Sequence, residues 1–177
     1  MLKQKLTARK LLAAGTAALA IGAVSSTDAA TTATSNLAVT ASVAANCTIA
    51  TAPVAFGAYD PVSANATTAL NGTGTVSVTC TNGATTTVTL GQGANAAGGS
   101  TAAAPARRLK DGGTDFLTYS LYSDNGRTTV WGDTAGTGVA HTGTGTLTAL
   151  TVYGAVDAGQ NVPAGNYSDT VVATITF

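Results

Sequence analysis

Hydrophobic and polar residues alternate in several short segments of the chain, and this alternation predicts β-strands. The first such segment is SNLAVTASVAANC, residues 35–47, in which Leu37, Val39, Ala41 and Val43 occupy every second position. Side chains on a strand point alternately to opposite faces, so these four residues would share one face. The segment therefore predicts a strand with one apolar face, whose pairing partner is not evident from the segment itself.

Further alternating segments follow, separated by turn signals at regular intervals. Three of them place three residues each on one face: Val76, Val78 and Cys80; Thr86, Val88 and Leu90; Leu117, Tyr119 and Leu121. Asn82-Gly83 is a strong turn signal and predicts a hairpin from about Thr75 to Leu90. Short strands with regular turns, and no helical stripe after the N-terminal segment, predict an all-β sandwich.

The segments between these strands carry weaker predictions. Pro53 and Pro61 exclude a long central strand, so a short edge strand and a turn are expected there. The low-complexity run from Gly91 to Ala106 predicts a flexible surface connection. The cluster that follows it is expected on a solvated loop or edge: Arg107, Arg108, Lys110 and Asp111.

The N-terminal segment, residues 1–29, predicts a secretory signal peptide. Four basic residues in MLKQKLTARK precede the apolar run LLAAGTAALAIGAV, which is shorter than the about 20 residues of a membrane span. Cleavage is expected after Ala29, because cleavage after Ala30 would put Asp28 at a position that favours a small residue. The alternative is an uncleaved membrane anchor. We expect no membrane insertion of the mature chain, since no second apolar stretch could span a bilayer.

Composition and charge then limit the function classes. The chain is 45% hydrophobic, which suffices for a core, and contains no Glu. Without the signal segment it has four basic and seven acidic residues, a net charge of −3. A basic surface is needed for nucleic-acid binding, so no nucleic-acid partner is expected.

Two cysteines, Cys47 and Cys80, allow a single intramolecular disulfide, which an oxidising compartment would permit. The alternatives are free thiols or an intermolecular bridge. A metal site is not expected, because the only histidine, His141, has no ligand set around it in the sequence.

Catalytic motifs are scarce. His141 lies in a Gly/Thr-rich stretch, and no pattern supplies the orienting acid and nucleophile that a triad needs. The glycine-rich run after Leu90 lacks the Lys of a phosphate-binding loop. The sequence therefore predicts neither an enzyme nor a cofactor, and it favours a secreted β-domain that works by binding or assembly.

A set of segments covering essentially the whole chain after the signal resembles a known family. It comprises the alternating segment before CTI, then FGAYDP, VSVTC, LTYSLYSDNGRTTVWGD, TVYGAV and VPAGNYSDTVVATITF. The most specific part is P-A-G-x-Y-x-D-T-V followed by alternating residues to Phe177. On these residues the chain resembles the spore coat protein U domain family, and within it the major pilin of archaic, Csu-type chaperone–usher pili.

The resemblance implies an incomplete immunoglobulin-like β-sandwich whose last strand is supplied in trans. Residues 30–46 would be an N-terminal donor strand and residues 47–177 the pilin domain, whose C-terminal strand has no further strand after it. Four residues would enter a neighbour's groove: Leu37, Val39, Ala41 and Val43. The groove wall would include Val171, Ala173, Ile175 and Phe177, or else the opposite face through Val172.

The resemblance also implies partners and a location. A periplasmic chaperone would fill the groove first, and an outer-membrane usher would exchange it for the donor strand of an identical or homologous subunit. The product would be a cell-surface fimbria that supports adhesion and biofilm formation. The disulfide would anchor the base of the donor segment.

Three alternatives remain open at this point. Residues 35–47 could be the first strand of a self-complete sandwich. The protein could be a secreted coat or matrix protein without a fibre. It could also be a carbohydrate-binding adhesin module that uses Tyr119, Tyr122 and Trp131 as a stacking surface.

Overall fold

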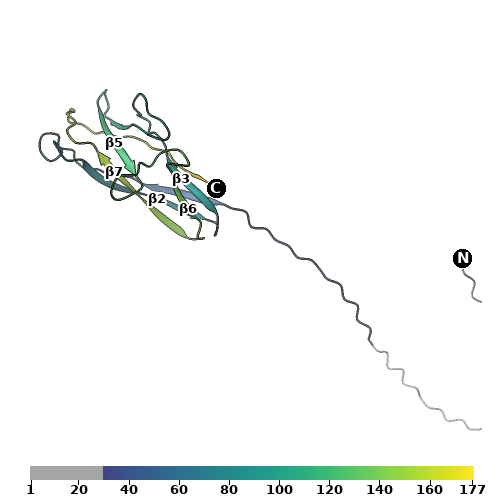
Figure 1. Cartoon of the computed structure of the whole chain (residues 1–177). Helices are drawn as coiled ribbons and strands as arrows, with labels where there is room; N and C mark the ends of the chain where they lie inside the picture. Colours follow the sequence, from purple (N-terminus) through teal and green to yellow (C-terminus); the bar gives the residue numbers. More distant parts are fainter. Residues whose placement is uncertain (1–29) are drawn as a thin grey trace, which may run out of the picture. The chain divides into compact units, whose positions relative to one another are not determined.

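The computed structural model describes residues 30–177, and the predicted signal peptide lies outside the described residues. Within them the chain forms strands and no helix (Figure 1). The strands are β1 (Cys47–Ala52), β2 (Leu70–Cys80), β3 (Thr85–Leu90), β4 (Arg107–Lys110), β5 (Phe116–Tyr122), β6 (Val139–Thr142), β7 (Leu147–Val156) and β8 (Ala173–Thr176). The chain consists of two compact units with a boundary after Thr40. All the strands belong to the unit Ala41–Phe177.

The strands form two antiparallel sheets. The larger sheet has five strands in the order β1-β2-β7-β5-β4, and the smaller has three in the order β6-β3-β8. Residues from both sheets form one hydrophobic cluster, so the sheets are the two layers of a sandwich. The prediction of an all-β sandwich is confirmed.

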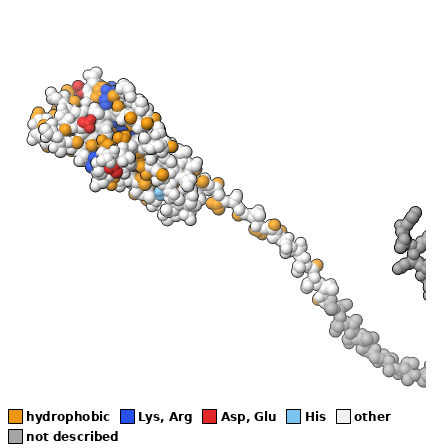
Figure 2. Space-filling view, in the orientation of Figure 1, with side chains coloured by type: hydrophobic (Ala, Val, Ile, Leu, Met, Phe, Trp, Pro, Cys, Tyr) orange, Lys and Arg blue, Asp and Glu red, His pale blue; other side chains and the backbone are white. Residues whose placement is uncertain are grey.

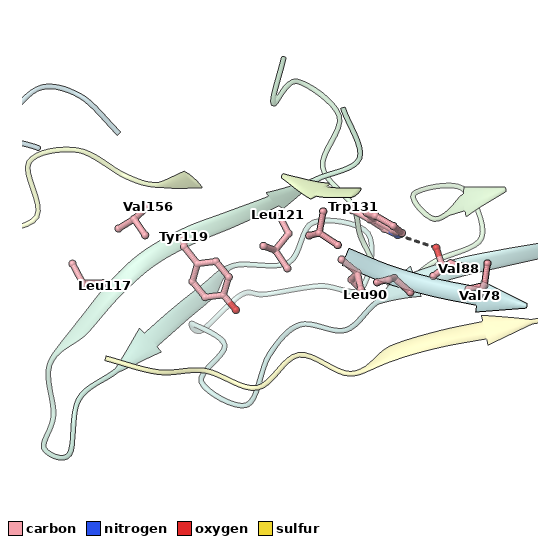
Figure 3. Packing of buried hydrophobic residues seen from close by; sticks show 10 residues of the cluster. Val78, Val88, Leu90, Leu117, Tyr119, Leu121, Trp131 and Val156 are labelled. Atoms are coloured by element: carbon pink, nitrogen blue, oxygen red, sulfur yellow. Dashed lines mark hydrogen bonds between the residues drawn. The ribbon is translucent and has the colours of Figure 1, made fainter. Parts of the chain in front are cut away.

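The predicted inward faces of the strands are also confirmed. Val76, Val78 and Cys80 of β2 are buried, and the predicted faces of β3 and β5 are buried as well. Trp131, which is 0% exposed, fills the core between them, and its indole nitrogen donates to the carbonyl oxygen of Val88 at 2.8 Å (Figure 3). Alternation along each strand therefore identified the side that packs into the core.

The predicted hairpin from Thr75 to Leu90 is wrong, because β2 and β3 belong to different sheets. Both edges of β2 are already taken, by β1 on one side and by β7 on the other. The Asn82-Gly83 turn instead carries the chain from one layer to the other, with Gly83 at a φ of 81°. The turn signal was correct, but the local sequence did not reveal the strand partners.

The region around the two prolines agrees with the prediction. β1 is the edge strand of the larger sheet and ends immediately before Pro53.

The connection from Gly91 to Ala106 was expected to be a flexible surface loop, but backbone hydrogen bonds hold it at both ends. Gly91 N donates to Val172 O, Ala94 N donates to Thr170 O, and Ala97 N donates to Ala106 O.

The basic cluster departs further from the prediction. Arg107 begins the edge strand β4, but its side chain is 0% exposed rather than solvated. Its guanidinium donates to the carbonyl oxygens of Leu90 at 2.7 Å, Gly91 at 2.8 Å and Trp131 at 2.9 Å. These oxygens replace water as partners of the charge, which makes burial of the side chain tolerable.

Candidate functional site: an open groove between two sheet edges

The sandwich has a free edge in each layer on the same side. β1 pairs only with β2, and β8 pairs only with β3, so each leaves one backbone edge without a partner strand in residues 30–177. β1 and β8 contact each other across the two layers. An unpaired strand edge exposes backbone donors and acceptors and can accept another strand.

A groove begins where β1 ends and β8 begins, and it extends beyond both strands. It consists of a cavity of about 720 Å³ and a smaller one of about 200 Å³. The two cavities share four lining residues and are therefore continuous: Val54, Phe56, Leu109 and Asp169. One wall is built by residues between 51 and 61, and the other by residues between 162 and 173. Core side chains, among them Leu117, Tyr119 and Val156, reach its floor.

The first wall lies against the inner face of the larger sheet because that sheet contains glycines where the wall approaches. A Cβ at Gly154 would lie 2.7 Å from the ring of Phe56, and a Cβ at Gly74 would lie 2.7 Å from Val54 Cγ2. Glycine inside a strand is a known sign of such a close approach. This signal was present in the sequence, and reasoning from alternation alone missed the wall.

The second wall is the segment that leads into β8. Ser168 exchanges backbone hydrogen bonds with Lys110 of β4. Thr170 and Val172 accept from the Gly91–Ala94 region, and Ala173 then begins the pairing with β3. The segment therefore crosses from the larger sheet to the smaller one and closes one side of the groove.

One carboxylate lies in this groove, whose lining combines apolar side chains with polar groups. Asp169 accepts a hydrogen bond from Tyr119 Oη at 2.7 Å, and its other oxygen accepts from the backbone N and the Nδ2 of Asn95, both at 3.1 Å. Burial, and then the hydrogen bond to Asp169, raise the pKa of Tyr119. The carboxylate therefore serves to hold the floor and the second wall together, and sequence reasoning did not single it out.

Only some of the residues predicted to form the groove wall line the groove. Val171 and Ala173 line the smaller cavity, and Ile175 is half-buried against the core. Phe177 is 54% exposed, and Val172, on the opposite face, is 67% exposed. Of the two faces left open by the sequence, the one with Val171 and Ala173 turns toward the groove.

The predicted donor residues lie in a segment without secondary structure. Residues 30–46 form no strand (Figure 1), and Leu37, Val39 and Val43 are 87%, 85% and 86% exposed. Ala41 is exposed as well. The structure therefore assigns no strand to residues 35–46, and the first strand of the sandwich begins at Cys47.

The C-terminal end of this segment is fixed to the sandwich. The predicted disulfide between Cys47 and Cys80 is confirmed, and it joins two positions that lie opposite each other in the β1–β2 pairing. One residue further out, Asn46 N donates to Thr81 Oγ1 at 3.1 Å, and Thr81 N donates to Asn46 O at 2.9 Å. The β1–β2 contact thus continues past the disulfide to the base of the segment.

The aromatic stacking surface proposed from the sequence is not formed. Trp131 is 0% exposed and Tyr119 is 4% exposed, so both belong to the core.

His141 lies on β6 and its Nε2 is buried. Across residues 30–177 no three His, Cys, Asp or Glu side chains come together as a metal-binding group.

The fold and the groove together define the class of protein: an all-β sandwich of the kind found in chaperone–usher pilus subunits. The chain is similar to a protein in the crystal structure of the CsuC–CsuE chaperone–tip adhesion subunit pre-assembly complex from archaic chaperone-usher Csu pili of Acinetobacter baumannii. The TM-score is 0.55 at 18% identity, over 76% of this chain. The match spans 40% of the other chain, and it supports the fold.

The chain belongs to the Spore Coat Protein U domain family, whose model matches residues 33–174. It is 49% identical to Protein U of Myxococcus xanthus over 173 residues, which cover 94% of this chain and 96% of that protein. The described part of the chain contains no helix long and apolar enough to cross a membrane.

Proposed function

We propose that this protein is a structural subunit of a surface fimbria, assembled through the chaperone–usher pathway by donor-strand complementation. One observation carries the proposal. The sandwich has an open groove with apolar core side chains at its floor, which begins where two free strand edges meet it, while the chain also contains an exposed, alternating segment that pairs with no strand of its own sandwich. The groove of one subunit and the segment of another are complementary in chemistry.

In this proposal residues 30–46 are the donor strand, and residues 47–177 form the domain that accepts it. The donor backbone satisfies the free edges, and alternate side chains enter the groove. Burial of Leu37, Val39 and Val43 at roughly 1.5–3 kcal/mol each contributes about 5–9 kcal/mol before ordering costs. Ala41 is smaller and contributes less. Val171 and Ala173 contact the donor directly, while Ile175 and Phe177 extend the same face of the C-terminal strand.

An empty groove is an aggregation hazard, which explains the need for further partners. A periplasmic chaperone covers the groove after export, and an outer-membrane usher exchanges it for the donor strand of the next subunit. The fibre then emerges at the cell surface, where it supports adhesion and biofilm formation. The Cys47–Cys80 bond transmits tension from the donor strand to the body of its own subunit.

The name of the family favours a second candidate, a structural protein of a spore or cell coat. The same groove and segment could join subunits within a coat layer. Immunogold labelling of whole cells and spores distinguishes the two candidates, because fimbriae place the label on filaments that extend beyond the surface, whereas a coat protein confines it to a continuous layer.

The proposal is tested by charge substitutions on the two faces of the donor segment. Leu37→Asp or Val39→Asp places a carboxylate where the groove is apolar, so export and the disulfide should persist while fibres are lost in electron micrographs. Ala38→Asp and Thr40→Asp are the matched controls, since these neighbours lie on the alternate face and should permit fibres. Normal fibres from Leu37→Asp or Val39→Asp would refute the assignment of these residues.

A further inference from the structure

The basic side chains of the described chain are distributed unevenly. There are four of them, and Arg107 is buried in the core. The other three lie on the outer face of the larger sheet, where β4, β5 and β7 run side by side: Arg108, Lys110 and Arg127. We call this the outer β4–β5–β7 face. Asp111 and Asp115 adjoin Lys110 and Phe116 in the sequence, and Asp124 lies in the loop of Arg127, so acidic side chains also stand near both ends of this face; Figure 2 shows basic and acidic side chains on one side of the molecule.

Each of these three cations lies against an aromatic ring of the outer β4–β5–β7 face. Arg108 lies 3.9 Å and Lys110 5.8 Å from the centre of the Phe116 ring, and Arg127 lies 5.8 Å from the centre of the Tyr153 ring. Phe116 and Tyr153 alternate with the buried Leu117 and Val152, so the rings belong to the outside of the sheet.

Two tyrosine hydroxyls on this face have no hydrogen-bond partner within residues 30–177. Tyr59, Tyr119 and Tyr167 donate their hydroxyls to oxygens within the sandwich. The hydroxyls of Tyr122 and Tyr153 have no such partner in residues 30–177, and both side chains are half-buried. These two residues lie directly opposite each other on β5 and β7. Their hydroxyls are therefore available to a ligand.

The loop that carries Arg127 is held in a set conformation. Arg127 is the one non-glycine residue in the described chain with a positive φ, 54°. The Asp124 carboxylate accepts hydrogen bonds from Thr128 N and Thr129 N, and Arg127 Nε donates to Gly154 O at 3.0 Å. Such a backbone conformation costs energy and is characteristic of functional loops. The guanidinium is thereby fixed beside Tyr153.

The groups along β5 form a row. Phe116 and Tyr122 are six residues apart, which corresponds to about 20 Å along an antiparallel strand. Thr118 and Ser120 lie between them on the same face and carry hydroxyls. The row therefore begins with an aromatic ring and two cations, continues with hydroxyls, and ends with two tyrosines and a third cation.

We propose that the outer β4–β5–β7 face binds an acidic polysaccharide. The C–H faces of sugar rings pack against aromatic side chains, and sugar hydroxyls bond to Thr, Ser and Tyr hydroxyls. Sugar carboxylates pair with Lys110 and Arg127, because the Arg108 guanidinium already donates to Asn95 O and Ala96 O and stacks on Phe116. The net charge of residues 30–177 is −3, from four basic and seven acidic residues, which disfavours a densely charged nucleic acid. The groove lies inside the sandwich and this face outside it, so both can be occupied in one subunit.

The test measures binding of the disulfide-intact chain, residues 30–177, to polygalacturonate by affinity electrophoresis. Dextran serves as the neutral polymer and a single-stranded oligonucleotide as a second polyanion. We expect binding to polygalacturonate that weakens as salt is added, because exposed charges are screened, and no comparable binding to the other two. No binding to polygalacturonate, equal binding to dextran, or equally tight binding to the oligonucleotide would each overturn the proposal.

Variants locate the site. Lys110→Gln combined with Arg127→Gln should weaken binding about tenfold. The matched control moves a charge instead of removing it: Lys110→Gln with Thr85→Lys keeps the net charge but places the lysine on the exposed outer side of the smaller sheet. This variant should bind like Lys110→Gln alone. Binding restored to the level of the unsubstituted chain would show that net charge alone decides, and would overturn the site.

Discussion

The guanidinium of Arg107 lies in the interior of the sandwich and joins segments that are far apart in the sequence. It donates to the end of β3 at Leu90 and Gly91, and to the Trp131 segment. Burial lowers the pKa of this guanidinium, while Tyr119, Asp169 and Asp133 act in the opposite direction. Arg107 thus links the edge strand of the larger sheet to the smaller sheet.

Replacement of Arg107 by Leu should therefore destabilise the sandwich more than replacement of its neighbour. Three buried carbonyl oxygens would lose their donor, and we expect a loss of about 2–5 kcal/mol in the free energy of unfolding. Arg108→Leu is the control, because Arg108 lies outside the core, where it donates to two half-buried carbonyls of the surface loop and stacks on Phe116. Urea unfolding of both variants, in the Leu37→Asp background to prevent assembly, measures the difference. Equal losses would contradict the linking role of Arg107.

Because the pKa of Tyr119 is raised, we expect the stability of the sandwich to depend on pH. The pKa is raised in the folded protein, so above about pH 10 the unfolded chain releases the phenolic proton while the folded chain retains it. The unfolded state then binds fewer protons, and stability should fall by up to about 1.4 kcal/mol per pH unit. Below pH 10 the contribution of Tyr119 is fully present.

The comparison is between Tyr119→Phe, which should lose this alkaline slope, and Tyr122→Phe, which should keep it because Tyr119 is still present. Urea unfolding between pH 8 and 11 gives the slopes for both variants and for the unsubstituted chain. An unchanged slope in Tyr119→Phe would show that other groups cause the alkaline loss.

At the residue scale, regular alternation within β2, β3 and β5 predicted which residues are buried. Val76, Val78 and Leu121 are examples, because period-two patterning reports the face of a strand directly. Arg107 and Asp169 could not be predicted in this way. Their charge suggests exposure, and their partners are brought together only by the three-dimensional fold.

At the scale of elements, the disulfide joins the strand β1 to β2 at the point where the N-terminal segment begins. Cys47 and Cys80 are 33 positions apart in the sequence. The double variant Cys47→Ala with Cys80→Ala should lose about 3.8 kcal/mol of stability by the chain-entropy model. Urea unfolding in the Leu37→Asp background measures this loss, and reduction of the unmodified disulfide in that background should reproduce it. A loss below about 1 kcal/mol would contradict a stabilising role.

Strand positions were more predictable than strand partners. The edge strand before Pro53 and the strand FLTYSLY were both expected, because proline and alternation act locally. The pairing of β2 with β1 and β7, in place of the expected hairpin with β3, depends on contacts that are remote in the sequence. Gly74 and Gly154 were the local clue that a further segment packs on this sheet.

At the scale of the whole molecule, the proposed function pairs the free edges of one copy of the chain with the N-terminal segment of another. The sequence predicted the apolar segment and a C-terminal strand, and the resemblance supplied the idea that they belong to different subunits. The first wall of the groove, residues 51–61, became visible only in the structure, whereas Val171 and Ala173 of the second wall were expected from the resemblance.

Photo-crosslinking from the donor segment tests the central claim most directly. A photoreactive amino acid replaces Val39 in isotopically light chains, which are assembled together with heavy chains, and mass spectrometry identifies the crosslinked peptides. We predict crosslinks between light and heavy chains that join residue 39 to residues 51–61 or 162–173, and few such crosslinks from residue 40. Crosslinks confined to a single chain, or directed to other surfaces, would contradict donor-strand assembly.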